Sequence, residues 1–448
     1  MRGDQLNLSR VVLLGYGVSG RACHRFLSTL GGEVVVVDDR LSALGLSEAL
    51  ALGVQSVGDL ATVSEVVGRD WPTLTIISPG VVPTHQALRY FSGKTIGEFE
   101  FGWRMSDSKV AAITGTNGKT TVTFLVAEML EASGIPAVPT GNYGLPFIEL
   151  APDGTSNLWS VAEASSFQLH YSSDFRPDIA ALLNVTPDHL DWHGDFGSYR
   201  RSKLKIFANQ SADDYAVVPD SEDETSGPVE TGQARRVTFG LDSGDFHVHQ
   251  GSLSAPFGEI AQVARLRRKS SYEIRNLLAA SAVAVTAGAE SSAVTEIVTS
   301  FSGLEHRVEL FATYHGVDFI DDSKATTPAS VIAAVMGLNR CVLIAGGRNK
   351  GLDLSPLRQV EPHLQALVAI GESAPELVDL FPELAAEGGV QVAKDMRAAV
   401  EAAYRLAGDG VPVILSPGST SYDWYQNYKE RGRDFKVQVL QMIERLGG

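Results

Sequence analysis

The sequence is poor in cysteine, in positive charge and in long apolar runs, and each shortage narrows what the protein can be. Its 448 residues include two cysteines, Cys23 and Cys341, which predicts a reducing, cytoplasmic environment and no zinc site. Lys and Arg number 37 against 53 Asp and Glu, and this net charge of −16 argues against a nucleic-acid or anionic-membrane surface. No apolar run reaches the roughly 18 residues of a membrane span, and the polar first ten residues predict no signal peptide.

The chain is rich instead in short apolar runs that alternate with helical patterns. This alternation predicts an α/β fold. A chain of this length is too long to fold around one hydrophobic core, so we expect three domains, at 1–106, 107–305 and 306–448. The first and third are predicted to be Rossmann-like, and the central one to be a phosphate-loop domain with a mostly parallel sheet. The Ala-rich stretch 277–289 predicts a buried helix.

A glycine-rich turn follows the first predicted strand. Residues 11–14 form that strand, 15–20 read Gly-x-Gly-x-x-Gly, and a helix continues to Leu30. The next strand, 34–37, ends at Asp38, with Arg40 close behind. This arrangement is typical of NAD binding, but the same turn accepts any diphosphate ligand, with Asp38 or Arg40 on its sugar or base. The glycines could also serve only the packing of helix on strand.

A second glycine loop carries the strongest signal. A short buried strand at 110–113 leads into Thr114-Gly115-Thr116-Asn117-Gly118-Lys119-Thr120-Thr121, and a helix follows that ends near Gly134. Strand, glycine loop, Lys-Thr and helix is the order of a phosphate-binding loop, although the usual first glycine is replaced by Ile113. Backbone N–H groups and the helix N-terminus favour phosphate oxygens, Lys119 can reach the terminal phosphates, and the Thr120 hydroxyl can hold Mg²⁺.

Polar residues also follow the other predicted strands of the central and third domains, where open α/β sheets bind ligands. In the central domain these strands are 158–162 and 179–185. Glu163 is placed like the acid that holds Mg²⁺ near a phosphate loop. His189 could be a second ligand, although alone it is better explained as a surface turn residue. Lys203 lies on a basic helix that alone predicts a solvated face. In the third domain the polar segments are 321–327, 346–351 and 416–423.

Together these segments resemble the Mur ligase family, and within it the branch that adds glutamate. The similarity covers nearly the whole chain. It rests on residues 115–121, 163–168, 184–189, 199–203, 303–307, 322–326 and 415–417. The resemblance implies an ATP-dependent ligase of peptidoglycan precursor synthesis, which joins glutamate to the alanine carboxylate of UDP-N-acetylmuramoyl-L-alanine through an acyl phosphate. It implies ATP and two Mg²⁺ ions as cofactors, and we expect a monomer.

The resemblance also implies residue roles. ATP would contact Gly115, Thr116, Asn117, Gly118, Lys119, Thr120, Thr121, Asn276, Arg307 and Asp322. The UDP-linked acceptor would contact Gly17, Val18, Ser19, Asp38, Arg40, Gly80, Asn142, Ser165 and Gln168. Glutamate would contact Thr326, Lys350, Ser421 and Tyr428. Metal ligands would be Thr120, Glu163, His189 and a carbamylated Lys203, and the catalytic residues would be Lys119, Lys203, His189 and Lys324.

The sequence departs from the family pattern in two places that matter for specificity. Arg275-Asn276 with Ala279 replaces a His-Asn pair and a second Asn near the ATP base, and residues 417–424 differ from the usual loop at the amino-acid site. D-glutamate is the expected substrate, and L-glutamate or another amino acid is the alternative that these departures leave open. An NAD-dependent oxidoreductase and a noncatalytic nucleotide switch are the alternatives of other classes.

Overall fold

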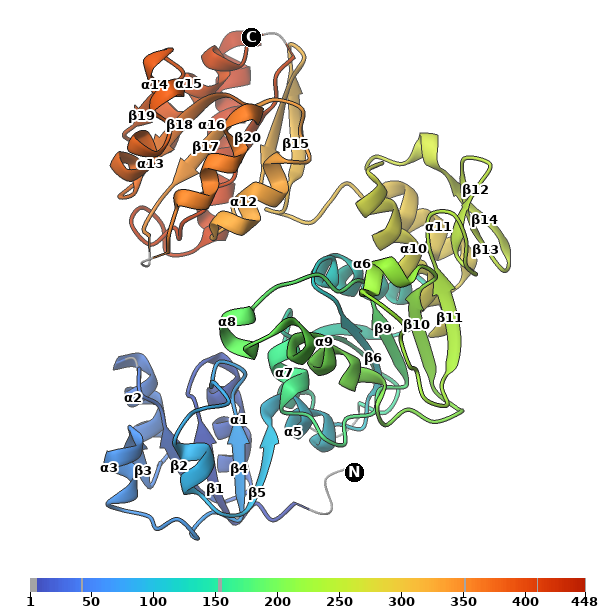
Figure 1. Cartoon of the computed structure of the whole chain (residues 1–448), viewed down its shortest axis with the longest axis vertical. Coiled ribbons are helices and arrows are strands. Elements are labelled where there is room, and N and C mark those ends of the chain that lie inside the picture. Colours follow the sequence, from blue (N-terminus) through green and yellow to red (C-terminus); the bar gives the residue numbers. More distant parts are fainter. Residues whose placement is uncertain (1–5, 42, 152–154, 350–351, 409, 448) are drawn as a thin grey trace. The chain divides into compact units, whose positions relative to one another are not determined.

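A computed structural model describes residues 6–41, 43–151, 155–349, 352–408 and 410–447 (Figure 1). The chain forms two compact units, 1–301 and 302–448. The α/β class is confirmed, with mostly parallel sheets and helices between successive strands. The division of the first unit at residue 106 stays a prediction. Within the described ranges no helix combines the length and apolarity that crossing a bilayer requires.

The first sheet of unit 1 is parallel and has five strands. Its order is β3 (Ser56–Gly58), β2 (Glu33–Val37), β1 (Arg10–Leu14), β4 (Leu74–Ile77) and β5 (Lys94–Gly97). Helices α1 (Val18–Thr29), α2 (Ala43–Ala51), α3 (Leu60–Ser64) and α4 (Ala87–Tyr90) connect them. The run of four valines in β2 is buried throughout, as expected for a parallel strand covered on both faces. The strands predicted at 11–14 and 34–37 are confirmed.

The central sheet is also parallel and has six strands. Its order is β11 (Arg235–Phe239), β10 (Tyr215–Pro219), β9 (Ile179–Leu182), β6 (Lys109–Thr114), β8 (Trp159–Glu163) and β7 (Ala137–Gly141). β9 ends at Leu182, although the sequence predicted a strand to residue 185. The Leu183 N–H still donates to the Thr114 carbonyl of β6, but the backbone groups that follow bond to loops. The Asn184 carbonyl accepts from Thr116 N, and Val185 N donates to the Glu224 carbonyl.

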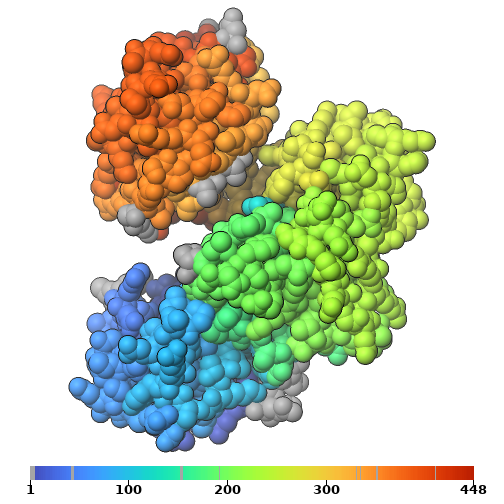
Figure 2. Space-filling model, viewed as in Figure 1, coloured from blue at the N-terminus to red at the C-terminus, as the bar shows by residue number. Residues whose placement is uncertain are grey.

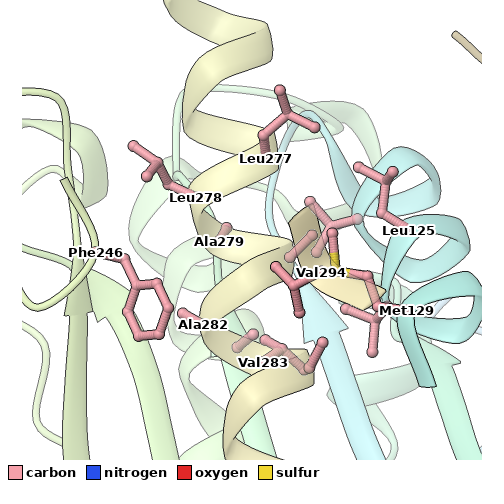
Figure 3. Packing of buried hydrophobic residues seen from close by; sticks show 14 of the residues in the cluster. Leu125, Met129, Phe246, Leu277, Leu278, Ala279, Ala282, Val283 and Val294 are labelled. Carbon is pink, nitrogen blue, oxygen red and sulfur yellow. The ribbon is translucent and has the colours of Figure 1, made fainter. Parts of the chain in front are cut away.

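Helices cover both faces of this sheet. One face carries α6 (Lys119–Ala132), α10 (Ser271–Thr286) and α11 (Ser291–Ser300), whose apolar side chains form one core (Figure 3). The predicted Ala-rich helix is α10, and its small side chains let it pack closely against α6. The opposite core draws on α5 (Glu98–Met105), the short η1 turn (Phe147–Leu150) and α9 (Phe196–Leu204). A small antiparallel sheet, β12 (His247–His249), β13 (Ser252–Ala255) and β14 (Gly258–Gln262), flanks α11.

Helix α5 contributes side chains to the cores of both large sheets of unit 1. All eight of its residues are buried, because it packs against α1, η1 and α7. Its Glu100 carboxylate and Arg104 guanidinium form a buried ion pair at 2.7 Å. The Glu100 carboxylate also accepts from the Ser173 backbone N, near the end of α7 (Ser166–His170). The blue and green regions of Figure 2 are therefore parts of one packed unit.

Unit 2 contains a six-stranded mixed sheet. Its order is β15 (Glu309–Tyr314), β16 (Val317–Asp321), β20 (Val413–Leu415), β17 (Cys341–Gly346), β18 (Leu364–Ile370) and β19 (Val390–Ala393), with only the β15–β16 pair antiparallel. Apolar cores lie on both faces. The helices are α12 (Pro328–Val335), α13 (Ala374–Leu380), α14 (Pro382–Ala386), α15 (Met396–Ala407) and α16 (Tyr428–Gly447). Pro328 is the first residue of α12, a position that proline favours.

Candidate active site

The glycine loop between β6 and α6 has the backbone form of a phosphate cradle. Gly118 caps α6 with φ +86°, a left-handed conformation that other residues adopt only with strain. A Cβ atom at this position would lie 2.4 Å from Oδ1 of Asn276, which is buried on α10. Both the backbone and the neighbouring amide therefore require glycine. The cradle opens at the positive end of the α6 dipole, where phosphate oxygens are favoured.

The segment after β9 holds this loop in place. The backbone N–H of Asn117 donates to Oδ1 of Asn184 at 2.9 Å, and Nδ2 of Asn184 donates back to the Asn117 carbonyl. The Thr116 hydroxyl lies 3.1 Å from the Thr186 carbonyl and 2.9 Å from the hydroxyl of Tyr199. These bonds come from a neighbouring strand end and from α9, so the loop is shaped before any ligand enters.

Two lysines converge on the loop. Lys119 Nζ donates to the carbonyls of Gly115 and Thr116, both at 2.9 Å, and Lys203 Nζ donates to the Gly115 carbonyl at 2.6 Å. Lys203 is 1% exposed and lies 4.7 Å from the centre of the Tyr199 ring. Burial and the charge of Lys119 hold the pKa of Lys203 well below its usual value. The predicted solvated basic face is therefore wrong for Lys203, which lies within the candidate site.

A set of oxygen ligands suited to Mg²⁺ lies at the end of β8 and in the first turn of α6. The Thr120 hydroxyl donates to Oε2 of Glu163 at 2.7 Å, and Nδ2 of Asn142 donates to Oε1 of the same carboxylate at 2.6 Å. Hydroxyl and carboxylate oxygens are the ligands that Mg²⁺ prefers beside a phosphate loop, so these residues fit the ion. His189 is about half exposed, and its ring lies 3.4 Å from the Asp188 carboxylate and beside the rings of Phe167 and Tyr199.

A cavity of about 560 Å³ opens at the carboxyl ends of β1, β2 and β4. Its lining includes all six residues predicted there for the acceptor: Gly17, Val18, Ser19, Asp38, Arg40 and Gly80. A Cβ at Gly20 would lie 2.2 Å from the Gly15 carbonyl oxygen, so this glycine serves packing. A Cβ at Gly17 would meet nothing within 4 Å. Packing therefore explains why residue 20 is a glycine. It does not explain the glycine at position 17, which lines the cavity.

Asp38 shapes this cavity through backbone contacts. Its carboxylate accepts from the backbone N–H groups of Tyr16, at 2.6 Å, and Arg40, at 2.8 Å. Asp39 and His85, two lining residues that sequence reasoning missed, meet across the rim at 3.1 Å. The pattern gave no signal for His85, because it follows β4 by eight residues and is placed only by the fold.

The two predicted acceptor residues after β8 are fixed by helix capping. Ser165 caps α7, and the Ser165 hydroxyl accepts from the backbone N–H of Gln168 at 3.2 Å. Oε1 of Gln168 in turn accepts from the Ser165 backbone N–H and hydroxyl, each at 3.0 Å. The remaining amide nitrogen, Nε2, donates to the buried Glu98 carboxylate at 3.3 Å. Sequence reasoning missed Glu98, which begins α5.

In unit 2 the predicted residues lie at or near the carboxyl ends of β16 and β20. The Asp322 carboxylate accepts from the Ser416 hydroxyl at 2.7 Å and from the Val308 backbone N–H at 3.2 Å. Burial raises the pKa of Asp322 to about 7. Lys324 Nζ lies 5.7 Å from the centre of the Tyr428 ring. Arg307 is half-buried just before β15, Thr326 is half-buried and Ser421 is buried. Lys350 lies outside the described residues.

Arg431 organises this end of unit 2 and was also missed from the sequence. It is 1% exposed on α16 and donates to Oγ of Ser323 at 3.0 Å, to the Ser323 carbonyl at 2.9 Å and to the Ser419 carbonyl at 3.1 Å. These acceptors follow β16 and β20, so one guanidinium ties two strand-end loops together. Burial lowers the pKa of Arg431 to about 10. An arginine in a late helix carries no motif that identifies it.

Comparison with known proteins identifies the class to which this site belongs. Residues 113–284 match the family model for the Mur ligase middle domain, and residues 306–419 match that for the Mur ligase glutamate ligase domain. The chain therefore belongs to the Mur ligase family. It is an ATP-dependent ligase that forms amide bonds, and like the family it uses ATP and Mg²⁺.

Relatives over nearly the full length narrow the class further. The chain is 36% identical to the UDP-N-acetylmuramoylalanine--D-glutamate ligase of Desulfotalea psychrophila, over 96% of this chain and 95% of the relative. It is 37% identical to the enzyme of the same name from Desulfosudis oleivorans, with 97% of each chain covered. Among solved structures, MurF from Acinetobacter baumannii matches with a TM-score of 0.59 at 17% identity, covering 98% of this chain and 95% of that one. The last likeness supports the fold alone.

Proposed function

We propose that this ligase joins D-glutamate to the alanine carboxylate of UDP-N-acetylmuramoyl-L-alanine, with ATP as the energy source, in peptidoglycan precursor synthesis. The observation that carries the proposal is the near-full-length similarity to relatives of that name, at 32–37% identity. A cavity suited to a nucleotide diphosphate and a phosphate loop within the same unit support it. The other amino acids and L-glutamate are the alternatives that the assay below separates.

The chemistry follows from the weakness of a carboxylate as an acylating agent. Transfer of the γ-phosphoryl group of ATP to the alanine carboxylate gives an acyl phosphate, whose phosphate is a good leaving group. The amine of glutamate attacks the acyl carbon, and the amide forms as phosphate departs. The protein contributes alignment and charge neutralisation in these steps.

The central residues divide this work. Residues 115–121 bind the ATP phosphates through backbone N–H groups, and Lys119 turns from the Gly115 and Thr116 carbonyls to a phosphoryl oxygen. Asn276 lies against Gly118, where it contacts the nucleotide. Thr120, Glu163, His189 and a carbamylated Lys203 would hold two Mg²⁺ ions, which would supply charge neutralisation at the phosphoryl oxygens. A buried lysine of lowered pKa supports carbamylation, because the uncharged amine is the form that adds to CO₂.

The substrates use the strand ends described above. The uridine diphosphate lies in the cavity lined by Gly17, Val18, Ser19, Asp38, Arg40 and Gly80, while Asn142, Ser165 and Gln168 contact the remainder of the acceptor. In unit 2, Arg307 and Asp322 contact ATP, and Lys324 acts on the phosphoryl group. Thr326, Lys350, Ser421 and Tyr428 bind glutamate. We further propose that the enzyme is a cytoplasmic monomer with three domains, 1–106, 107–305 and 306–448.

The proposal is tested by a ligation assay with UDP-N-acetylmuramoyl-L-alanine, ATP and Mg²⁺, in which D- and L-glutamate are compared side by side. We expect phosphate release and a product of the added glutamate mass with the D-enantiomer only. Lys119→Ala should lose this activity, and the exposed Glu65→Gln is the control. Activity with a different amino acid would overturn the substrate assignment, and NADH binding without acceptor-dependent phosphate release would overturn the ligase assignment.

A further inference from the structure

Glu98 is a buried carboxyl group that lies outside both the phosphate loop and the lining of the nucleotide cavity. It begins α5, directly after β5, and is 2% exposed. Its carboxylate accepts from Nε2 of Gln168 at 3.3 Å and interacts with the Ser19 hydroxyl, and both of these side chains are neutral. Burying a carboxyl group without a cation is unfavourable, and an apolar residue would fill the same space without that penalty. Packing therefore does not explain why a carboxyl group stands here.

The two partners of Glu98 belong to different parts of the proposed acceptor site. Ser19 lines the nucleotide cavity at the start of α1. Gln168 lies on α7, where its amide oxygen is already fixed by the Ser165 backbone and hydroxyl. The carboxylate fixes the other end of that amide, because Nε2 of Gln168 donates to Oε1 of Glu98. One side chain thus contacts both the diphosphate end and the acyl end of the site.

The opposite end of α7 is tied to the same cavity. The Tyr171 hydroxyl donates to the carbonyl of Val81, a lining residue, at 2.8 Å, and the Gly97 backbone N–H donates to the Tyr171 carbonyl at 3.1 Å. A Cβ at Gly97 would lie 2.9 Å from Cβ of Tyr171, so the chain next to Glu98 packs directly on α7. α7 is therefore held at a fixed position relative to the nucleotide cavity.

We propose that Glu98 is a positioning residue for the acceptor substrate, which holds Ser19 and Gln168 at the separation that a UDP-sugar with an attached alanine requires. This inference rests on the proposed function. Without the Glu98 carboxylate oxygens, the Gln168 amide and the Ser19 hydroxyl both lose the hydrogen-bond partner that fixes them. The acceptor then binds a site whose two halves are no longer fixed, whereas the ATP loop keeps its own contacts with residues 184–186.

The test compares Glu98→Leu, Glu98→Gln and the exposed control Glu65→Gln by steady-state kinetics in each substrate. Glu98→Leu should raise the KM for the acceptor by about tenfold or more, while the KM values for ATP and D-glutamate stay within about twofold. Glu98→Gln keeps an acceptor oxygen and should remain near wild type. A loss spread equally over all three substrates, or a fall in kcat alone, would overturn the inference and indicate a merely structural role.

A swap variant keeps the test decisive if Glu98→Leu does not fold. Gln168→Glu places two carboxyl groups in contact and should raise the acceptor KM strongly. Glu98→Gln combined with Gln168→Glu restores a carboxyl–amide pair and should recover most of the loss. A double variant no better than Gln168→Glu would overturn the inference. Failure of the proposed function can be told apart from failure of this inference, because the wild type itself would then not ligate glutamate. In that case the binding of UDP to the cavity at Ser19 can still be measured by calorimetry in the wild type and the variants.

Discussion

Gly118→Ala is the substitution whose effect the structure predicts most directly. Gly118 has φ +86°, and an alanine there carries a strain of about 1–2 kcal/mol. Its Cβ would lie 2.4 Å from Oδ1 of Asn276, whereas ordinary van der Waals contact begins at 3.4 Å. The loop or Asn276 must therefore shift by about 1 Å, and a misplacement of this size lowers a rate about 100-fold. We expect kcat/KM for ATP to fall by about that factor.

Gly134→Ala is the matched control, because Gly134 lies just beyond the opposite end of the same helix. It also has a left-handed backbone, with φ +71°, but a Cβ there meets nothing within 4 Å. Both variants should lose a similar amount of thermal stability from backbone strain. Only Gly118→Ala should lose ATP-dependent phosphate release, measured across an ATP titration. Equal kcat/KM values for the two variants would refute the steric argument at Gly118.

Three further substitutions test other parts of the structure. Lys203→Ala should be nearly inactive and partly rescued by short-chain carboxylic acids that replace a carbamate; wild-type turnover would contradict the metal-orienting role. Burial raises the pKa of Glu98 from 4.5 to about 7. Between these pH values the folded protein keeps a proton that the unfolded chain has released. The stability that this protonated carboxyl group contributes is therefore lost as the pH rises through 7. Glu98→Gln should therefore gain stability relative to wild type between pH 5 and 8, by up to about 3 kcal/mol in urea unfolding, and a pH-independent difference would argue against the shift. Arg431→Lys cannot reach both Ser323 and Ser419, so it should lower stability by about 2 kcal/mol and raise the KM for glutamate; an unchanged KM would show that those loops do not need the guanidinium.

The order of elements was readable from the sequence because local physics determines it. β6 and α6 follow from a run of apolar residues, a glycine turn and a helical period. The Ala-rich segment could be recognised as a buried helix for the same reason. The one clear error in strand length, at β9, arose because Val185 is as apolar as a strand residue, while its backbone N–H bonds to the loop at Glu224. Apolar character predicts burial but not the partner of a backbone group.

Motif spacing likewise predicted which side chains gather at the strand ends, since the carboxyl ends of parallel strands meet at one edge. Thr120 and Glu163 are 43 residues apart, and their contact at 2.7 Å follows from that rule. Lys203 illustrates the limit. Its helix reads as a solvated basic face, yet Lys203 is buried against the Gly115 carbonyl.

What the sequence by itself determined is the succession of strands, loops and helices and the family to which their motifs belong, because these depend on neighbours along the chain. Only the tertiary structure decided the contacts of Glu98, His85 and Arg431. Each makes its defining contacts with residues from other segments, such as Glu98 with Gln168 and Arg431 with Ser323. No local pattern encodes such a contact, because it exists only once the sheets and helices have packed.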